Sequence, residues 1–137
     1  MAVKRPFRAS LIAPCGMDCA ICMAFLREKN RCPGCRSPDR RHHEHCQIFA
    51  CEKRTGRYCF RCAEFPCSRM ELLDKRYRTR YGMSMLENLD AIRQNGTRMF
   101  IRAEEGRWIC RACGGTIDVH HGCCSKCGKE RERKHYR

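Results

Sequence analysis

Fifteen cysteines among 137 residues are the main candidates for chemistry in this sequence. Several occur as Cys-x-x-Cys pairs, in which two thiolates can bind the same metal ion. The last two pairs are the most specific, because ten residues separate them and a glycine follows each pair. This spacing predicts a closed four-thiolate zinc site, a structural zinc ribbon, with the ligands Cys110, Cys113, Cys124 and Cys127.

Ten further cysteines lie between Cys15 and Cys67 and can supply two more four-thiolate sites. We expect one site to use Cys19, Cys22, Cys32 and Cys35, and the other to use Cys46, Cys51, Cys59 and Cys62. Cys15 and Cys67 are then left over, and other partitions are open: Cys15 can replace Cys19, and Cys67 can replace Cys46 or Cys51. Together with the C-terminal site this corresponds to about three zinc ions.

An iron–sulfur cluster in the N-terminal block is the alternative, because four thiolates accept either zinc or a cluster. The run Cys15-x3-Cys19-x2-Cys22 has the spacing found in radical S-adenosylmethionine enzymes, but this chain is too short for the β/α barrel that such enzymes need. A protein with iron or exchangeable zinc here would act in electron transfer, redox sensing or metal handling. Surplus thiols such as Cys15, Cys67 and Cys123 would be its reactive groups.

Histidines near the cysteines are secondary ligand candidates. His42, His43 and His45 lie in a basic loop, and His120 and His121 precede the last pair. We interpret all five as solvent-exposed residues rather than ligands. Beside them, the Cys-x-x-Cys spacing favours Cys124 over Cys123 as a ligand.

The composition offers little for a large apolar core, since 8% of residues are aromatic and 32% are charged. Metal binding is therefore expected to contribute to folding. The sequence shows no N-terminal secretion signal and no long apolar segment, which predicts a cytoplasmic protein without a membrane anchor. In a reducing cytosol the cysteines are expected to bind metal rather than form disulfides.

The cysteine-free segment between the two cysteine-rich blocks must position them, and its apolar spacing predicts helices. A first helix is expected from a capping box at Ser68 to Gly82, burying Met70, Leu73, Tyr77 and Tyr81. A second is expected from a capping box at Ser84 to Gly96, burying Leu86, Leu89 and Ile92. A short third helix is expected to carry Met99, Phe100 and Ala103.

The flanking blocks are predicted to be less regular. Asp18 is a candidate cap for a helix that runs to Leu26, and the β-forming residues Trp108, Ile109, Ile117 and Val119 predict a hairpin around the last cysteines. The expected fold class is α+β: a small metal-stabilised domain with N-terminal cysteine knots, a short helical middle and a C-terminal zinc-ribbon β-hairpin. The corresponding regions are 1–67, 68–106 and 107–128, followed by a charged tail, 129–137.

The formal net charge of +14 points to an acidic partner. Each four-thiolate zinc site contributes about −2, so three sites would lower the net charge to about +8. Candidate contacts to nucleic acid are Lys75, Arg76, Arg78 and Arg80. We expect a non-enzymatic protein whose basic surface contacts nucleic acid, a ribosome or an acidic protein, because no catalytic zinc motif occurs.

Four motifs resemble those of the small prokaryotic family catalogued as domain of unknown function 3795. They are Ala-Pro-Cys-Gly-Met-Asp-Cys-x2-Cys at 13–22, Cys-Pro-Gly-Cys at 32–35, Cys-Phe-Arg-Cys-Ala-Glu-Phe-Pro-Cys at 59–67 and Arg-Trp-Ile-Cys-x2-Cys-Gly-Gly at 107–115. The resemblance runs from about Ala13 to Gly128. It implies a bacterial or archaeal, zinc-binding protein and carries no established activity.

Overall fold

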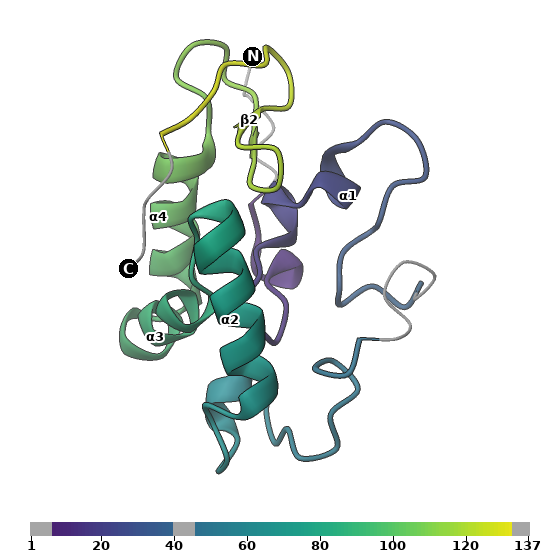
Figure 1. The fold of residues 1–137 in the computed structure, drawn as a ribbon, viewed down its shortest axis with the longest axis vertical. Coiled ribbons are helices and arrows are strands. Elements are labelled where there is room, and N and C mark those ends of the chain that lie inside the picture. Colours follow the sequence, from purple (N-terminus) through teal and green to yellow (C-terminus); the bar gives the residue numbers. More distant parts are fainter. Residues whose placement is uncertain (1–6, 40–45, 133–137) are drawn as a thin grey trace.

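Three helices form the regular part of the molecule in a computed structural model that describes residues 7–39 and 46–132. They are α2 (Ser68–Tyr81), α3 (Met85–Asn95) and α4 (Thr97–Trp108). Figure 1 shows them grouped on one side of the molecule, with the C-terminal hairpin at one end and the irregular segment after α1 along the other side. The hairpin pairs β1 (Ile117–Asp118) with β2 (Cys123–Cys124), antiparallel. The fold class is therefore α+β, as expected.

Helix α2 ends as predicted but begins differently. Gly82 terminates it in the left-handed conformation, at φ 63°. At the other end, Cys67 is the N-cap and its carbonyl accepts from the backbone N–H of Glu71, at 3.0 Å. Ser68 is already the first helical residue, so the capping box expected there is wrong. Met70 is buried on the inner face, and Leu73, Tyr77 and Tyr81 are half-buried.

Helix α3 follows the sequence prediction at both ends. The Ser84 Oγ accepts a hydrogen bond from the backbone N–H of Glu87 at 3.1 Å, which satisfies one of the unpaired donors of the first turn. Gly96 follows the last residue, Asn95. Leu89 and Ile92 are buried, and Leu86 is half-buried.

Helix α4 is longer than expected and buries a different face. Its inner side is formed by Phe100, Glu104 and Trp108, four residues apart, which is the spacing that aligns side chains along a helix. Met99, Phe100 and Ala103 all lie on this helix, as expected, but Met99 and Ala103 are exposed and only Phe100 is buried. The expectation that Trp108 belongs to the hairpin is wrong, because Trp108 is in the last turn of this helix. The inner stripe contains a carboxylate, which apolar spacing alone does not indicate.

The N-terminal segment runs through the centre of the molecule. Asp18 caps a short 3-10 helix, Cys19–Ile21, through a hydrogen bond from the Ala20 N–H at 3.0 Å. The chain is extended at Cys22 before α1 (Met23–Leu26), so the continuous helix expected here is wrong. Shorter 3-10 helices occur at Ala9–Leu11 and Cys59–Arg61. A single cluster of buried residues runs from Phe7 to Val119 and includes side chains from all three long helices.

A buried carboxylate joins α2 to the start of α3. Asp74 accepts hydrogen bonds from the Ser84 hydroxyl at 2.6 Å, the Leu86 N–H at 3.0 Å and the Arg78 guanidinium at 2.7 Å. Its charge therefore has three donors although the residue is almost inaccessible to solvent. None of the helices within 7–39 and 46–132 has the length and apolar character to span a membrane.

We predict that Asp74→Ala lowers the free energy of unfolding by about 2–3 kcal/mol, because the Ser84 hydroxyl, the Leu86 N–H and the Arg78 guanidinium lose their charged, buried acceptor. Denaturant titration measures the change. Asp90→Ala is the matched control on α3, because Asp90 forms an exposed ion pair with Arg93; we expect a loss of less than about 0.5 kcal/mol. Equal losses in the two variants would contradict the role of the Asp74 network.

Candidate metal centre

Four cysteine sulfurs converge at the C-terminal hairpin. The Sγ atoms of Cys110 and Cys127 are 3.7 Å apart, those of Cys113 and Cys124 are 3.4 Å apart, and all four lie within 4.8 Å of one another. A tetrahedral zinc ion with Zn–S bonds of about 2.3 Å requires sulfurs about 3.8 Å apart. The geometry therefore fits one tetrahedral ion, and these four residues, hereafter the tetrad, can bind a metal.

Two similar turns position the tetrad. The Gly114 N–H donates to the Cys110 carbonyl at 2.8 Å, and the Gly128 N–H donates to the Cys124 carbonyl at 3.0 Å. Both glycines have positive φ, 76° and 78°, which residues with a side chain rarely adopt. The glycine after each Cys-x-x-Cys pair thus closes a turn, as the sequence predicted.

Backbone N–H groups favour the thiolate form of the first cysteine in each pair. Hydrogen bonds from the Cys113 and Ala112 N–H groups lower the pKa of Cys110. Burial acts to raise the pKa of Cys124, but N–H groups of Cys127 and Lys126, together with neighbouring thiols, lower it to about 7. Metal ligands must be deprotonated, so these turns prepare the site for an ion.

Gly115 has a separate, steric role. Its N–H donates to the Cys113 sulfur at 3.3 Å. A Cβ at this position would lie 2.7 Å from the Lys126 Cβ and 3.0 Å from the Cys124 Sγ. The sequence offered only the Gly-Gly pair as a signal of this close approach.

Cys123 lies outside the tetrad. It pairs with Asp118 in the hairpin, and its neighbour Cys124 pairs with Ile117, so the two adjacent side chains point to opposite faces of the strand. Cys124, which the spacing favoured over Cys123, is the residue whose sulfur lies with the other three.

The two histidines of the hairpin differ in role. His120 is half-buried, its Nδ1 accepts from the Met23 N–H at 3.2 Å, and its Nε2 is 2.8 Å from the Tyr77 hydroxyl. Burial lowers the pKa of His120, which favours the neutral ring. The expectation that His120 is a surface residue is therefore wrong. His121 is exposed beside Asp118, at 2.6 Å, as expected. His42, His43 and His45 lie outside the described residues.

The first N-terminal set is assembled only loosely. The Cys35 N–H donates to the Cys19 sulfur at 3.3 Å, and the hydrogen bond with the Cys35 thiol, together with burial, raises the pKa of Cys19. Burial also raises the pKa of Cys22, with smaller contributions from Cys35 and Cys32. Within 7–39 and 46–132, no three N-terminal cysteines bring their sulfurs within 4.8 Å of one another. A site at Cys19, Cys22, Cys32 and Cys35 stays a prediction.

The remaining N-terminal cysteines separate into two groups. A cavity of about 30 Å³ is lined by Cys51, Cys59, Cys62 and Cys67. Burial raises the pKa of Cys59 to about 11; Arg54 opposes this, and the other three thiols add to it. Cys46 does not line this cavity. Burial raises the pKa of Cys15 to about 12, and Cys35, Cys46 and Cys59 influence it, so Cys15 lies between the two predicted sets.

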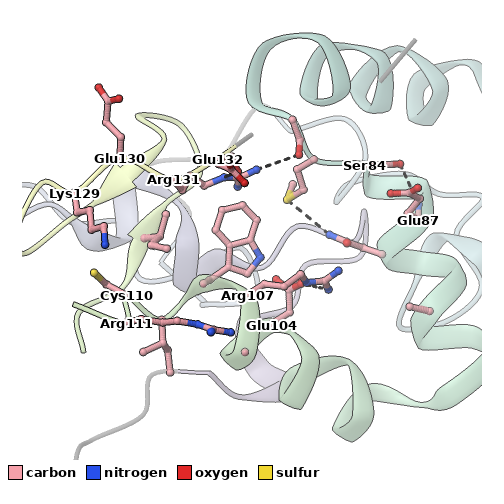
Figure 2. A pocket seen from close by; sticks show the side chains of 18 residues that line it. Ser84, Glu87, Glu104, Arg107, Cys110, Arg111, Lys129, Glu130, Arg131 and Glu132 are labelled. Carbon is pink, nitrogen blue, oxygen red and sulfur yellow. Dashed lines mark hydrogen bonds and ion pairs between the residues drawn. The ribbon is translucent and has the colours of Figure 1, made fainter. Parts of the chain in front are cut away.

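A larger cavity, of about 760 Å³, adjoins the tetrad at Cys110. Figure 2 shows that its labelled side chains carry both signs of charge; they come from the start of α3, from α4 and the turn after it, and from residues 129–132. The Arg131 guanidinium lies 4.2 Å from the centre of the Trp108 ring, a cation–π contact. Arg107 pairs with Glu104 at 2.6 Å, so part of the charge in the wall is neutralised within the protein.

Glu104 also faces a second buried carboxyl, that of Asp18. In the described part of the chain, Asp18 Oδ2 and Glu104 Oε2 are buried without a donor. Burial, then the charge of Glu104, raises the pKa of Asp18 to about 8, and burial raises the pKa of Glu104. Arg107 acts to lower the pKa of Glu104, whereas the charge of Glu104 raises the pKa of Asp18 further. The environment therefore favours the protonated form of Asp18, which can donate a hydrogen bond to the Glu104 carboxylate. No pattern in the sequence indicated that these carboxyl groups meet.

The basic candidates on α2 are not equivalent. Lys75, Arg76 and Arg80 are exposed, whereas Arg78 is half-buried in its ion pair with Asp74. Tyr77 and Tyr81 pack against the His120 ring, with centroids 5.6 and 4.9 Å from it. The two tyrosines therefore belong to the hairpin contact, as their place on the apolar face indicated.

Fold and tetrad together define a small α+β protein with a four-cysteine site that can bind a metal ion. Residues 11–72 match the family described as "Protein of unknown function (DUF3795)", which confirms the resemblance of the N-terminal motifs. The match contains the ten N-terminal cysteines and ends before the tetrad. No curated protein and no solved structure matches the chain.

We predict that Gly115→Ala lowers the free energy of unfolding of the zinc-loaded protein by about 1–3 kcal/mol, because the added methyl group overlaps Lys126 and the Cys124 sulfur. Thermal or denaturant unfolding in the presence of zinc measures the effect. Gly106→Ala is the control, because Gly106 lies within α4 and a methyl group added there would meet no atom within 4 Å. We expect that variant to gain up to about 1 kcal/mol. If Gly115→Ala left the free energy of unfolding unchanged, the steric requirement for glycine at this position would be refuted.

We predict that Asp18→Asn stabilises the protein increasingly as the pH rises from about 4 to about 8, with no further gain above that. Because the pKa of Asp18 is higher in the folded than in the unfolded state, its contribution to wild-type stability is most favourable below the unfolded-state pKa. That contribution is lost as the pH rises, until Asp18 is ionised in the folded state as well. The asparagine amide can donate to Glu104 at every pH. Parallel unfolding curves with excess zinc give the difference, and the exposed Asp90→Asn serves as control. If the difference in unfolding free energy between Asp18→Asn and the wild type did not change with pH, the raised pKa of Asp18 would be excluded.

Proposed function

We propose that this chain is a non-enzymatic zinc-binding protein, in which the tetrad is a structural zinc ribbon and the basic surface binds an acidic partner such as nucleic acid. The convergence of four sulfurs within 4.8 Å is the observation that carries the proposal. Four protein ligands fill the tetrahedral coordination of zinc, whereas catalytic zinc sites keep one position open for water or substrate.

Zinc would also supply what the hairpin lacks. Strands β1 and β2 have two residues each, too few for a hairpin that is stable by hydrogen bonding alone. An ion bound by both turns would hold the hairpin closed, and its binding free energy would add to that of folding.

The partner proposal is supported by charge and exposure. The sequence carries 29 basic against 15 acidic residues. On α2, Lys75 and Arg76 are exposed side by side, and Leu72 beside them is 66% exposed. Such residues can neutralise phosphates or carboxylates of a partner without disturbing the buried face of the helix.

Metal analysis tests the ribbon. We expect the protein purified without added metal to contain about three zinc ions and no iron. Cys127→Ser should lose one equivalent of zinc, because it removes a ligand of the tetrad, whereas Cys123→Ser should keep the full content. Chelation should abolish the thermal transition of the wild type. Full zinc content in Cys127→Ser would contradict the proposal, and iron with acid-labile sulfide would replace it by a redox function.

Binding to generic RNA and DNA tests the partner. We expect micromolar affinity that falls as the salt concentration rises. In Lys75→Ala/Arg76→Ala, the slope of log affinity against log salt concentration should become about 1–2 shallower, because each phosphate contact releases about one counterion. Arg98→Ala/Arg102→Ala is the control, since it removes the same charge from exposed positions of α4. Fluorescence anisotropy measures both. Affinity that does not depend on salt, or equal effects of the two double variants, would exclude the α2 surface.

A further inference from the structure

Four cysteines from three places in the chain line the small cavity in the N-terminal block. Cys59 begins a 3-10 helix, and the Cys62 N–H donates back to its carbonyl at 3.0 Å. Cys67 is the N-cap of α2, and the Cys51 N–H donates to the Ile48 carbonyl at 3.3 Å. The cavity of about 30 Å³ between the four residues therefore has a wall fixed by backbone hydrogen bonds.

Arg54 lines the same cavity and brings a second, independent feature. Its terminal nitrogens donate to the Gly56 carbonyl at 2.8 Å and to the Phe49 carbonyl at 3.1 Å. Its Nε is buried and has no acceptor among the residues that the structure describes. A buried N–H group without an acceptor is unfavourable, so this donor indicates that an acceptor belongs beside it.

We propose that Cys51, Cys59, Cys62 and Cys67 form a second zinc site, and that Arg54 is its positioning residue through a hydrogen bond from Nε to a ligand thiolate. Four thiolates with one Zn²⁺ carry a net charge of about −2, which the guanidinium partly offsets. Thiolate also provides the acceptor that the buried Nε lacks. Cys67 takes the place that the sequence spacing assigned to Cys46, because Cys67 lines the cavity and Cys46 does not.

The size of the cavity favours a single ion. A cavity of about 30 Å³ has room for one or two water molecules, and so for a single metal ion. A cluster of four iron and four sulfide atoms needs several times that space. No three of these sulfurs, all in the described part of the chain, lie within 4.8 Å of one another, so rotation about the Cα–Cβ bonds must draw them onto the ion.

This inference is independent of the tetrad, since the two sites share no residue. Each can fail while the other holds zinc.

Two single variants test the ligand assignment. We expect Cys67→Ser to lose one equivalent of zinc and Cys46→Ser to keep the full content, measured by elemental analysis of the purified full chain. A loss in Cys46→Ser with none in Cys67→Ser would overturn the assignment in favour of the partition expected from the sequence. Unchanged content in both variants would show that no zinc is bound here.

Thiol alkylation of the wild type tests the site without any substitution, in case Cys67→Ser does not fold. With mass spectrometry as readout, we expect Cys51, Cys59, Cys62 and Cys67 to become reactive together as chelator is added, separately from the tetrad. Cys46 should react at a rate that chelator does not change. Reactivity of the four cysteines that is independent of chelator, or iron bound in their place, would overturn the proposal.

The role of Arg54 is tested in the same assay. Arg54→Lys keeps the positive charge but lacks Nε, and we expect the chelator concentration that exposes the four cysteines to fall about 10–100-fold. The tetrad should release its ion at an unchanged concentration, which a general loss of stability would not allow. Arg57→Lys, at an exposed neighbouring position, is the matched control. If Arg54→Lys exposed the four cysteines at the same chelator concentration as the wild type, a positioning role of Arg54 would be excluded.

Discussion

The position of the tetrad depends on how the hairpin docks on the rest of the molecule. The Val119 N–H donates to the Ile21 carbonyl at 2.9 Å, and the neighbouring His120 accepts from the Met23 N–H on one ring nitrogen while the other contacts the Tyr77 hydroxyl. Val119 is fully buried at this junction. The strands of the hairpin are too short to hold its orientation, so these contacts orient it against α2 and the N-terminal segment.

The sequence predicted best where local chemistry decides the structure. Ser84 and Gly96 mark the ends of α3 because a side-chain cap and a glycine act within one turn. The Cys-x-x-Cys turns of the tetrad are local for the same reason. The prediction failed for α4, where a buried stripe contains Glu104. Its partner Arg107 is one turn away on the same helix, but Asp18 comes beside Glu104 only in the folded chain. Periodicity of apolar residues cannot register such a carboxylate.

The N-terminal cysteines show the same limit. Their spacing allows several partitions, and only the fold shows that Cys67, at the start of α2, lies beside Cys59 and Cys62 while Cys46 does not line their cavity. Arg54 could not have been selected from the sequence, because its importance rests on one nitrogen that folding buries without an acceptor among the described residues. The net charge likewise overestimates the number of basic side chains that can bind a partner, since Arg78 is already paired with Asp74.

The segment that matches the family is packed against parts of the chain that lie outside the match. Within residues 11–72, the Gly16 carbonyl is held by the Asn88 amide at 3.0 Å, and a Cβ on Gly16 would contact the Met85 carbonyl and Leu89, all on α3. The Ile21 carbonyl and Met23 N–H find their partners in the hairpin, 97 residues further on in the case of His120. A fragment cut at residue 72 would leave these groups and the apolar surface of Ile12 and Ile21 uncovered. We expect such a fragment to be partly folded and prone to aggregation, because apolar surface that the rest of the chain covers would face water.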